Sequence, residues 1–168
     1  MVQLAMRRLD FAGLPARPES VEVVALGPSD AAELATVLAL SFTDSTWDAA
    51  KATQVLLDSP DVDAVYGIRV DGRVVATASA QVRDRSQPVG TVHYVGTHPD
   101  ATGRGYGTWV TLRVLEHFRD AGMAEVNLST DDHRLAAIRT YQKLGFEPWM
   151  TDPSHPERWR AVLATLRR

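Results

Sequence analysis

Hydrophobic positions near the start of the chain alternate between a strand pattern and a helix pattern. Residues 21–26 form a β-rich run that ends at a Gly-Pro pair, which predicts a short strand. Ser29 or Asp30 then offers an N-cap for a helix with apolar residues at helical spacing through Leu38. A second helix is predicted over residues 47–57, where a Ser-Pro pair ends it.

The middle of the chain has the pattern of three antiparallel strands. Residues 62–70 alternate between apolar and polar, and Asp71-Gly72 separates them from a second β-rich run at 74–83, which predicts a hairpin. Residues 89–97 are predicted to form the third strand. Gly96 within it indicates a bulge or a close backbone approach.

Helical and strand patterns alternate again toward the end of the chain. Residues 108–121 carry apolar side chains at helical spacing and are followed by a glycine that suits a C-cap. A short strand is predicted over 124–130, and a helix over 131–144 that ends at Gly145 before a last short strand.

The two ends of the chain have different patterns. Residues 1–20 contain Pro15 and Pro18 and show no sustained period, so we expect an arm with little function that leads into one domain over 21–168. Residues 154–168 are predicted to form a terminal helix with Pro156 in its first turn.

Composition narrows the classes of partner. The 168 residues suit one compact domain, and 18 Lys plus Arg against 21 Asp plus Glu give a net charge of −3. This charge argues against nucleic acid and against an anionic membrane as partners. The absence of cysteine excludes disulfides, thiolate metal sites and a cysteine nucleophile. No signal peptide or membrane-spanning run is recognised, so we expect a cytoplasmic protein.

The glycine-rich segment THPDATGRGYG, from Thr97 to Gly107, lies between a predicted strand and a long helix. Glycines there let the backbone approach a phosphate, and the amides at a helix N-terminus favour an anion. A P-loop would need Lys-Ser or Lys-Thr after the glycines, and a Rossmann site would need a parallel crossover before them. Two interpretations of the segment remain: the pyrophosphate-binding loop of an acyl-CoA enzyme, and a glycine turn that only starts a helix.

The wider sequence over residues 62–149 resembles the GNAT family of N-acetyltransferases. The family's CoA loop has the form V-x-P-x-x-[QR]-x-x-G-x-[GA]; Thr97 stands at its Val, Pro99 at its Pro, and Gly105 and Gly107 at its glycines. The downstream segment YQKLGF matches a second family signature, Y-x-K-x-G-F.

One position of the loop departs from that pattern. Thr102 stands where the family usually has Gln or Arg, which puts one side-chain contact in doubt. Backbone amides are the chief ligands in such loops, and Arg104 is available for a phosphate of CoA.

The resemblance implies an α/β (α+β) fold of the GNAT acyl-CoA N-acyltransferase type. A mixed central sheet would be flanked by helices, and CoA would lie between two splayed strands, 89–97 and 124–130. The CoA-binding core would be 89–122 and the second motif 124–149.

The implied activity is direct transfer of an acetyl group from acetyl-CoA (coenzyme A) to a primary amine of a small molecule, without a metal. Two alternatives stay open: an enzyme that uses another thioester, carrier-bound or longer, and a non-catalytic acyl-CoA-binding module. The oligomeric state is also open, and a homodimer is allowed because many relatives form dimers.

Two residues are candidates for catalysis. Tyr141 stands at the tyrosine that protonates the CoA sulfur in many members of the family, although it also lies on the apolar stripe of its helix, as a core tyrosine would. His93 stands where related enzymes often carry a glutamate base, and a packed strand histidine is the alternative. Its neighbour Tyr94 is expected on the opposite face and is the weaker candidate.

The resemblance also implies a set of cofactor contacts. Arg134 stands near the family's Asn that contacts the CoA arm, and the preceding Asp131-Asp132 suits a helix cap. The predicted cofactor-binding residues are Val95, Gly96, Thr97, Thr102, Gly103, Arg104, Gly105, Tyr106, Gly107, Thr108 and Arg134.

The acceptor side is less determined. By analogy of fold its walls would be Phe42, Thr43, Trp47 and Trp149, although scattered aromatics are more often core. Members of the family commonly end in a strand near the acceptor, whereas this chain is predicted to end in a helix.

Overall fold

A computed structural model describes residues 1–167. The strands are β1 Leu4–Arg8, β2 Val23–Ala25, β3 Val62–Val70, β4 Arg73–Gln81, β5 Val89–Thr97, β6 Glu125–Thr130 and β7 Glu147–Trp149. The helices are α1 Ala31–Phe42, α2 Ala49–Ala52, α3 Tyr106–Asp120, α4 Leu135–Lys143 and α5 His155–Leu166. Short helical turns are η1 Pro28–Asp30, the π-helical turn η2 Thr53–Leu57 and η3 Pro99–Ala101.

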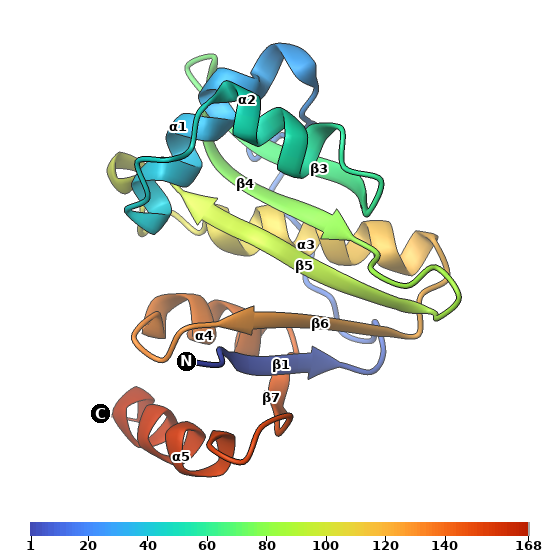
Figure 1. Cartoon of the computed structure of the whole chain (residues 1–168), viewed down its shortest axis with the longest axis vertical. Helices are drawn as coiled ribbons and strands as arrows, with labels where there is room; N and C mark the ends of the chain where they lie inside the picture. The colour runs from blue at the N-terminus through green and yellow to red at the C-terminus, as the bar shows by residue number, and fades with distance from the viewer. Residues whose placement is uncertain (168) are drawn as a thin grey trace.

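All seven strands form one sheet in the order β2-β3-β4-β5-β6-β1-β7 (Figure 1). The pair β5–β6 is parallel, and the other neighbouring strands are antiparallel. The predicted mixed sheet and the β3–β4 hairpin are therefore confirmed. The predicted second helix is shorter and irregular, because α2 passes after four residues into the π-helical turn η2.

Helices cover the two faces of the sheet because its side chains alternate between them. On β3, Val65 belongs to an apolar cluster with α1 and α2, whereas Tyr66 and Ile68 belong to the cluster with α3, α4 and α5. On β4, Ala76 and Ala78 are fully buried in the α3 cluster. Their small side chains let α3 lie close to the sheet.

The strands β5 and β6 pair only over their first residues. The register joins Val89, Gly90 and Thr91 to Glu125, Val126 and Asn127 in turn, and beyond these the two strands no longer pair. The predicted splayed pair is thus present. It leaves the second half of β5 with one edge that no other strand occupies.

A bulge bends β5 where the separation begins. Thr77 of β4 pairs with Gly96 and Ser79 with His93, so β5 carries one extra residue between them. Tyr94 has a positive φ of 48°, a conformation that non-glycine residues rarely adopt. Gly96 gave the right signal for a close approach, since a Cβ there would lie 2.8 Å from Ser41 Oγ.

The N-terminal segment is not an arm, which corrects the expectation for residues 1–20. Its strand β1 pairs with β6 on one side and β7 on the other, and Leu4 and Met6 are fully buried. Five residues that end in two arginines are too few to show a period, and their burial comes from strands that lie far away in the sequence.

The terminal helix is confirmed as α5, and Arg168 at its predicted end lies outside the described residues. The strand beside β6, on the side away from β5, is β1. Figure 1 shows the start of β1 and the end of α5 toward the left of the view. Arg158 of α5 donates a 2.7 Å hydrogen bond to the carbonyl of Val2. Within residues 1–167, no helix has the length and apolar character needed to cross a bilayer.

Candidate active site

A cavity of about 650 Å³ opens where β5 separates from β6. It is bounded by the second half of β5, the loop before α3, the first turn of α3, and α4. The residues that line it are Ser41, Val95, Thr97, Ala101, Thr102, Gly103, Gly105, Tyr106, Gly107, Thr108, His133, Arg134, Leu135, Ala136, Ala137, Thr140, Tyr141 and Lys143.

The glycine loop shapes one end of this cavity. Gly103 and Gly105 have φ values of 77° and 79°, so both need the left-handed region that glycine enters without strain. A Cβ on Gly105 would also lie 3.2 Å from Trp109 Nε1. The first hydrogen bond of α3 runs from Trp109 N to Gly105 O, and no side chain caps the helix. The amides from Tyr106 to Thr108 are therefore available to an anion.

Thr102 and Arg104 of the loop differ in how they lie relative to the cavity. Thr102 lines the cavity, but its hydroxyl donates a 3.0 Å hydrogen bond back to the carbonyl of Pro99. Arg104 does not line this cavity; it lines a second one of about 210 Å³ together with Arg73 and His98. The two cavities share Ala101 and Tyr106, so Arg104 lies next to the larger cavity without lining it.

The β5 side of the cavity brings several predicted residues together. Val95 and Thr97 line it, whereas Gly96 faces α1. Arg134 reaches across from the start of α4, and its Nη2 lies 3.5 Å from the carbonyl oxygen of Val95. Its guanidinium also lies 4.6 Å from the centre of the Phe42 ring.

Tyr141 joins the cavity from the opposite wall. It is 4% exposed and belongs to the apolar cluster with α3, α4 and α5. Tyr141 is therefore a core residue that also lines the cavity. Burial raises the pKa of Tyr141 to about 12, against a smaller opposing effect from the charge of Arg134. The phenol therefore stays protonated at every physiological pH and is able to act as a donor.

His93 lies beside Tyr94 and not in the cavity lining. The two ring centres are 4.0 Å apart, which corrects the expectation that they occupy opposite faces; the bulge at Tyr94 interrupts the alternation. Burial, with a smaller effect from the charge of Arg83, lowers the pKa of His93 to about 4. Its Nδ1 is buried and has no hydrogen-bond partner among the described residues.

Three aromatic rings meet next to His93. Tyr94 makes edge contacts with Phe42 and Trp47, at centre distances of 5.9 and 5.0 Å. Trp47 is only 7% exposed, so it is mainly core, while Phe42 also contacts Arg134. Thr43 is exposed at the end of α1.

Trp149, by contrast, is not brought together with these residues. It lies on β7 beside Arg7, whose guanidinium is 5.2 Å from the ring centre. Both β6 and β1 stand between β7 and β5.

Some residues of the cavity were missed in the sequence. Ser41 lines it because Gly96 lets the end of α1 approach β5, so the signal lay in Gly96 rather than in Ser41. His133 and Lys143 line it at the two ends of α4. Lys143 is the lysine of the segment YQKLGF, so its signal lay in that motif, and His133 directly precedes Arg134. No group of three metal-ligating side chains is present within residues 1–167.

Comparison with known families settles the relationship. The model of the acetyltransferase (GNAT) family matches residues 33–146, which is more than half of the chain. The chain belongs to the GNAT acetyltransferase family. The match contains the glycine loop, the splayed strands and Tyr141, so the GNAT fold predicted from the two motifs is confirmed.

Curated GNAT relatives include mycothiol acetyltransferases. The protein from Nocardiopsis dassonvillei is 47% identical over 66 residues, which are 39% of this chain and 20% of that protein. The protein from Actinosynnema mirum is 28% identical over 158 residues, covering 89% of this chain and 53% of that protein. The chain thus spans between a fifth and about half the length of these two relatives.

Solved structures show the same GNAT architecture. A protein of Novosphingobium aromaticivorans described as a GNAT-family acetyltransferase has a TM-score of 0.67 and 25% identity, covering 88% of this chain and 60% of that one. An N-acetyltransferase of Thermoplasma acidophilum, solved with coenzyme A, has a TM-score of 0.64 and 17% identity over 80% of this chain and 94% of that one.

Proposed function

We propose that this chain transfers an acetyl group from acetyl-CoA directly to a primary amine of a small molecule. The observation that carries this proposal is the cavity at the separation of β5 and β6, because it combines an anion-binding loop, a free strand edge and a buried phenol. The similarity to mycothiol acetyltransferases supports acetyl transfer to an amine, but its partial coverage does not select the acceptor.

The residues present fit coenzyme A. The amides from Tyr106 to Thr108 and the glycines at 103 and 105 would hold the pyrophosphate, since a side chain at either glycine would strain the loop. The free edge of β5 near Val95 would pair with the amide groups of the pantetheine arm. Bound there, acetyl-CoA supplies an activated acyl thioester at the reacting end of the cavity.

Tyr141 would serve as the general acid. Tyr141 belongs to the cavity lining, and its raised pKa keeps the phenol protonated before the reaction. As the C–N bond forms and the C–S bond breaks, the phenol proton would let CoA leave as the thiol, and the proton that the amine nitrogen loses would restore the phenol. Backbone amides of β5 beyond the bulge would polarise the thioester carbonyl.

His93 has a different place in this scheme. With a pKa of about 4 it is neutral at pH 7 and is a poor acceptor of a full proton from an ammonium group. Its Nδ1 is buried and His93 does not line the cavity, so this nitrogen does not face the acceptor. We therefore give His93 no proton-transfer role, and the acceptor enters as the free amine.

A thiol-release assay tests the proposal. Acetyl-CoA is offered with a panel of primary amines, and wild-type protein is compared with Tyr141→Phe; we expect acceptor-dependent thiol release that the variant loses. Parallel arms with a longer acyl-CoA and with an acylated carrier protein test the other donors. Protection by CoA in a thermal-shift assay without any release would favour a binding module, and silence in both assays would overturn the proposal.

A further inference from the structure

Arg134 presents an unneutralised positive charge to the acceptor end of the cavity. Its guanidinium contacts the Phe42 ring at 4.6 Å and the Val95 carbonyl at 3.5 Å, and no ion pair with a carboxylate is present within residues 1–167. The cavity lining contains no aspartate or glutamate. A half-buried arginine that has only a weak carbonyl contact retains the capacity for a strong anionic partner.

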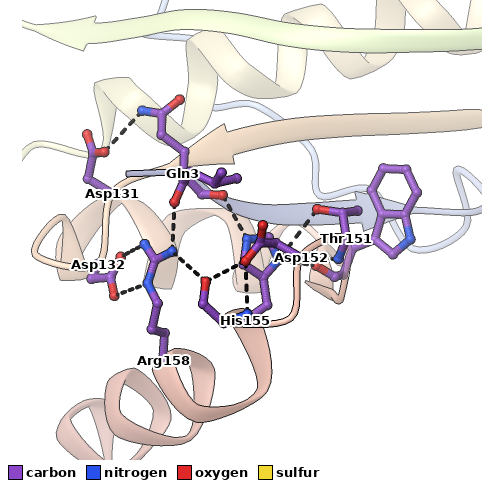
Figure 2. A network of polar contacts seen from close by, with 10 residues as sticks. Gln3, Asp131, Asp132, Thr151, Asp152, His155 and Arg158 are labelled. Carbon is purple, nitrogen blue, oxygen red and sulfur yellow. Dashed lines mark hydrogen bonds and ion pairs between the residues drawn. The ribbon is translucent and has the colours of Figure 1, made fainter.

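The two aspartates just before Arg134 are held away from it. Asp131 accepts a 3.1 Å hydrogen bond from Gln3 Nε2, and Asp132 accepts two from Arg158, with Nε at 2.9 Å from Oδ2. Figure 2 shows both carboxylates turned toward the N-terminal strand and α5. Pairing with Arg158 also lowers the pKa of Asp132.

The rest of this network fixes Arg158 and Gln3 in place. Arg158 donates to the carbonyl of Val2 at 2.7 Å, and the fully buried His155 holds the carbonyl of Gln3 with Nε2 at 3.0 Å (Figure 2). We call Gln3, Asp131, Asp132, His155 and Arg158 the terminal clamp. The terminal clamp pairs Asp132 with Arg158 and ties Asp131 to the amide of Gln3, so neither carboxylate forms an ion pair with Arg134 among the described residues.

Arg134 lies at the reacting end of the cavity rather than at the phosphate end. It touches Phe42 of the aromatic cluster, and its charge acts on Tyr141, which the proposed function places at the sulfur. The amides proposed for the pyrophosphate belong to the start of α3. A guanidinium at the junction of donor and acceptor would reach a group on the substrate next to the reacting amine.

We propose that Arg134 binds a carboxylate of the amine acceptor, so that the acceptor class is amino carboxylates such as amino acids. This inference rests on the proposed function. The planar guanidinium matches a carboxylate with two parallel hydrogen bonds, while its contact with Phe42 keeps the fork oriented. The same chemistry could come from a donor whose acyl group ends in a carboxylate, and the experiment separates these two sources.

The test compares amino carboxylates of increasing chain length with their neutral amides, with acetyl-CoA as the donor. For wild-type protein we expect kcat/KM to favour at least one carboxylate over its amide by about tenfold or more. In Arg134→Gln this ratio should fall to about twofold or less, and Arg134→Lys should retain part of it. The ratio is insensitive to a general loss of activity, because both acceptors meet the same enzyme and donor.

Arg139→Gln is the matched control, because Arg139 lies on the same helix but donates to the carbonyl of Leu166 in α5. It should keep the wild-type ratio. No preference in wild-type protein, or a preference that survives in Arg134→Gln, overturns the proposal. The other outcome is a preference for succinyl-CoA over acetyl-CoA, measured with a neutral amine as the acceptor and lost in Arg134→Gln. If only this preference is seen, the acceptor assignment is overturned and the carboxylate belongs to the donor.

Binding distinguishes this inference from the proposed function. The same amino carboxylates and amides are titrated into CoA-saturated protein by calorimetry. Carboxylate binding that Arg134→Gln abolishes, without any acetyl transfer, upholds the Arg134 site and refutes the catalytic proposal. Acetyl transfer that does not depend on Arg134 upholds the catalytic proposal and refutes the Arg134 site.

Discussion

Ser41 Oγ donates a 2.9 Å hydrogen bond to the carbonyl oxygen of Thr97 and so joins the end of α1 to the end of β5. The contact is feasible because Gly96, next to Thr97, has no side chain to hold α1 away. It connects the helix that carries Phe42 to the strand that would hold the cofactor. The spacing between the acceptor and donor sides therefore depends on one glycine.

Gly96→Ala should disturb this spacing. The new Cβ would lie 2.8 Å from Ser41 Oγ and 3.1 Å from Ser41 Cβ, so α1 must move or the Ser41 side chain must rotate. We expect a loss of about 1–3 kcal/mol in the free energy of unfolding, measured with urea, and a rise in KM for both substrates. Ser41→Ala combined with Gly96→Ala should recover part of the loss, and a fully additive double variant would contradict a direct clash.

Tyr141→Phe should reduce kcat by about 100-fold or more, because a general acid of this kind contributes that much to a proton-transfer step. The phenyl ring keeps the contact with Phe146, whose ring centre lies 6.1 Å away, so the melting temperature should stay close to that of wild type. The two measurements are steady-state kinetics and thermal unfolding. Unchanged kcat would leave Tyr141 as a core residue only.

His93 should make the stability of the protein depend on pH. Its pKa of about 4 in the fold lies below the value of 6.5 for a free histidine, so the unfolded chain binds the proton more readily between these values. The contribution of His93 is complete above pH 6.5 and is lost as the pH falls toward 4. Its size is at most about 3 kcal/mol and is lower after screening by solvent, since the side chain is only half-buried.

The measurement is the free energy of unfolding at pH 7.5, 6 and 5 for wild type and His93→Gln. The variant should show a smaller fall with acid, whereas His133→Gln should match wild type, because His133 is exposed. If the free energy of unfolding changes equally with pH in wild type and His93→Gln, burial does not disfavour the protonated imidazole.

Arg158→Met should act on the acceptor end from a distance. It releases Asp132, which then becomes free to neutralise Arg134 two positions along the chain. We expect the preference for carboxylate acceptors in kcat/KM to fall several-fold, with a lower melting temperature because α5 loses its contact with Val2. Arg158→Met together with Asp132→Asn should restore the preference but not the stability, and failure to restore it would break the link between the terminal clamp and Arg134.

The donor half could be predicted from the sequence because its signals are local. Asp71-Gly72 specified the hairpin turn, and the glycines at 103 and 105 occupy positive φ values that other residues avoid. Tyr141 followed from a motif of fixed spacing, and the structure places it in the cavity. Each of these features depends on residues a few positions apart.

The acceptor half could not be predicted because it depends on distant contacts. The bulge at Tyr94 places the tyrosine ring beside His93. A tyrosine in a β-rich run gives no sign in the sequence that its φ is positive. Trp149 was grouped with Phe42 by analogy, yet it lies on β7, which β6 and β1 separate from β5, whereas Phe42 ends α1. The isolation of Arg134 results from Gln3 and Arg158, which belong to opposite ends of the chain.

The position of β1 between β6 and β7 has a consequence for how the molecule is made. Gln3 and His155 touch although they are 152 positions apart, and Leu4 must find Thr130 before the sheet is continuous. Such contacts require a large loop to close, which slows folding. A ribosome-bound chain would hold β1 unpaired until β6 has emerged. Completion of the sheet is thus a late event in synthesis.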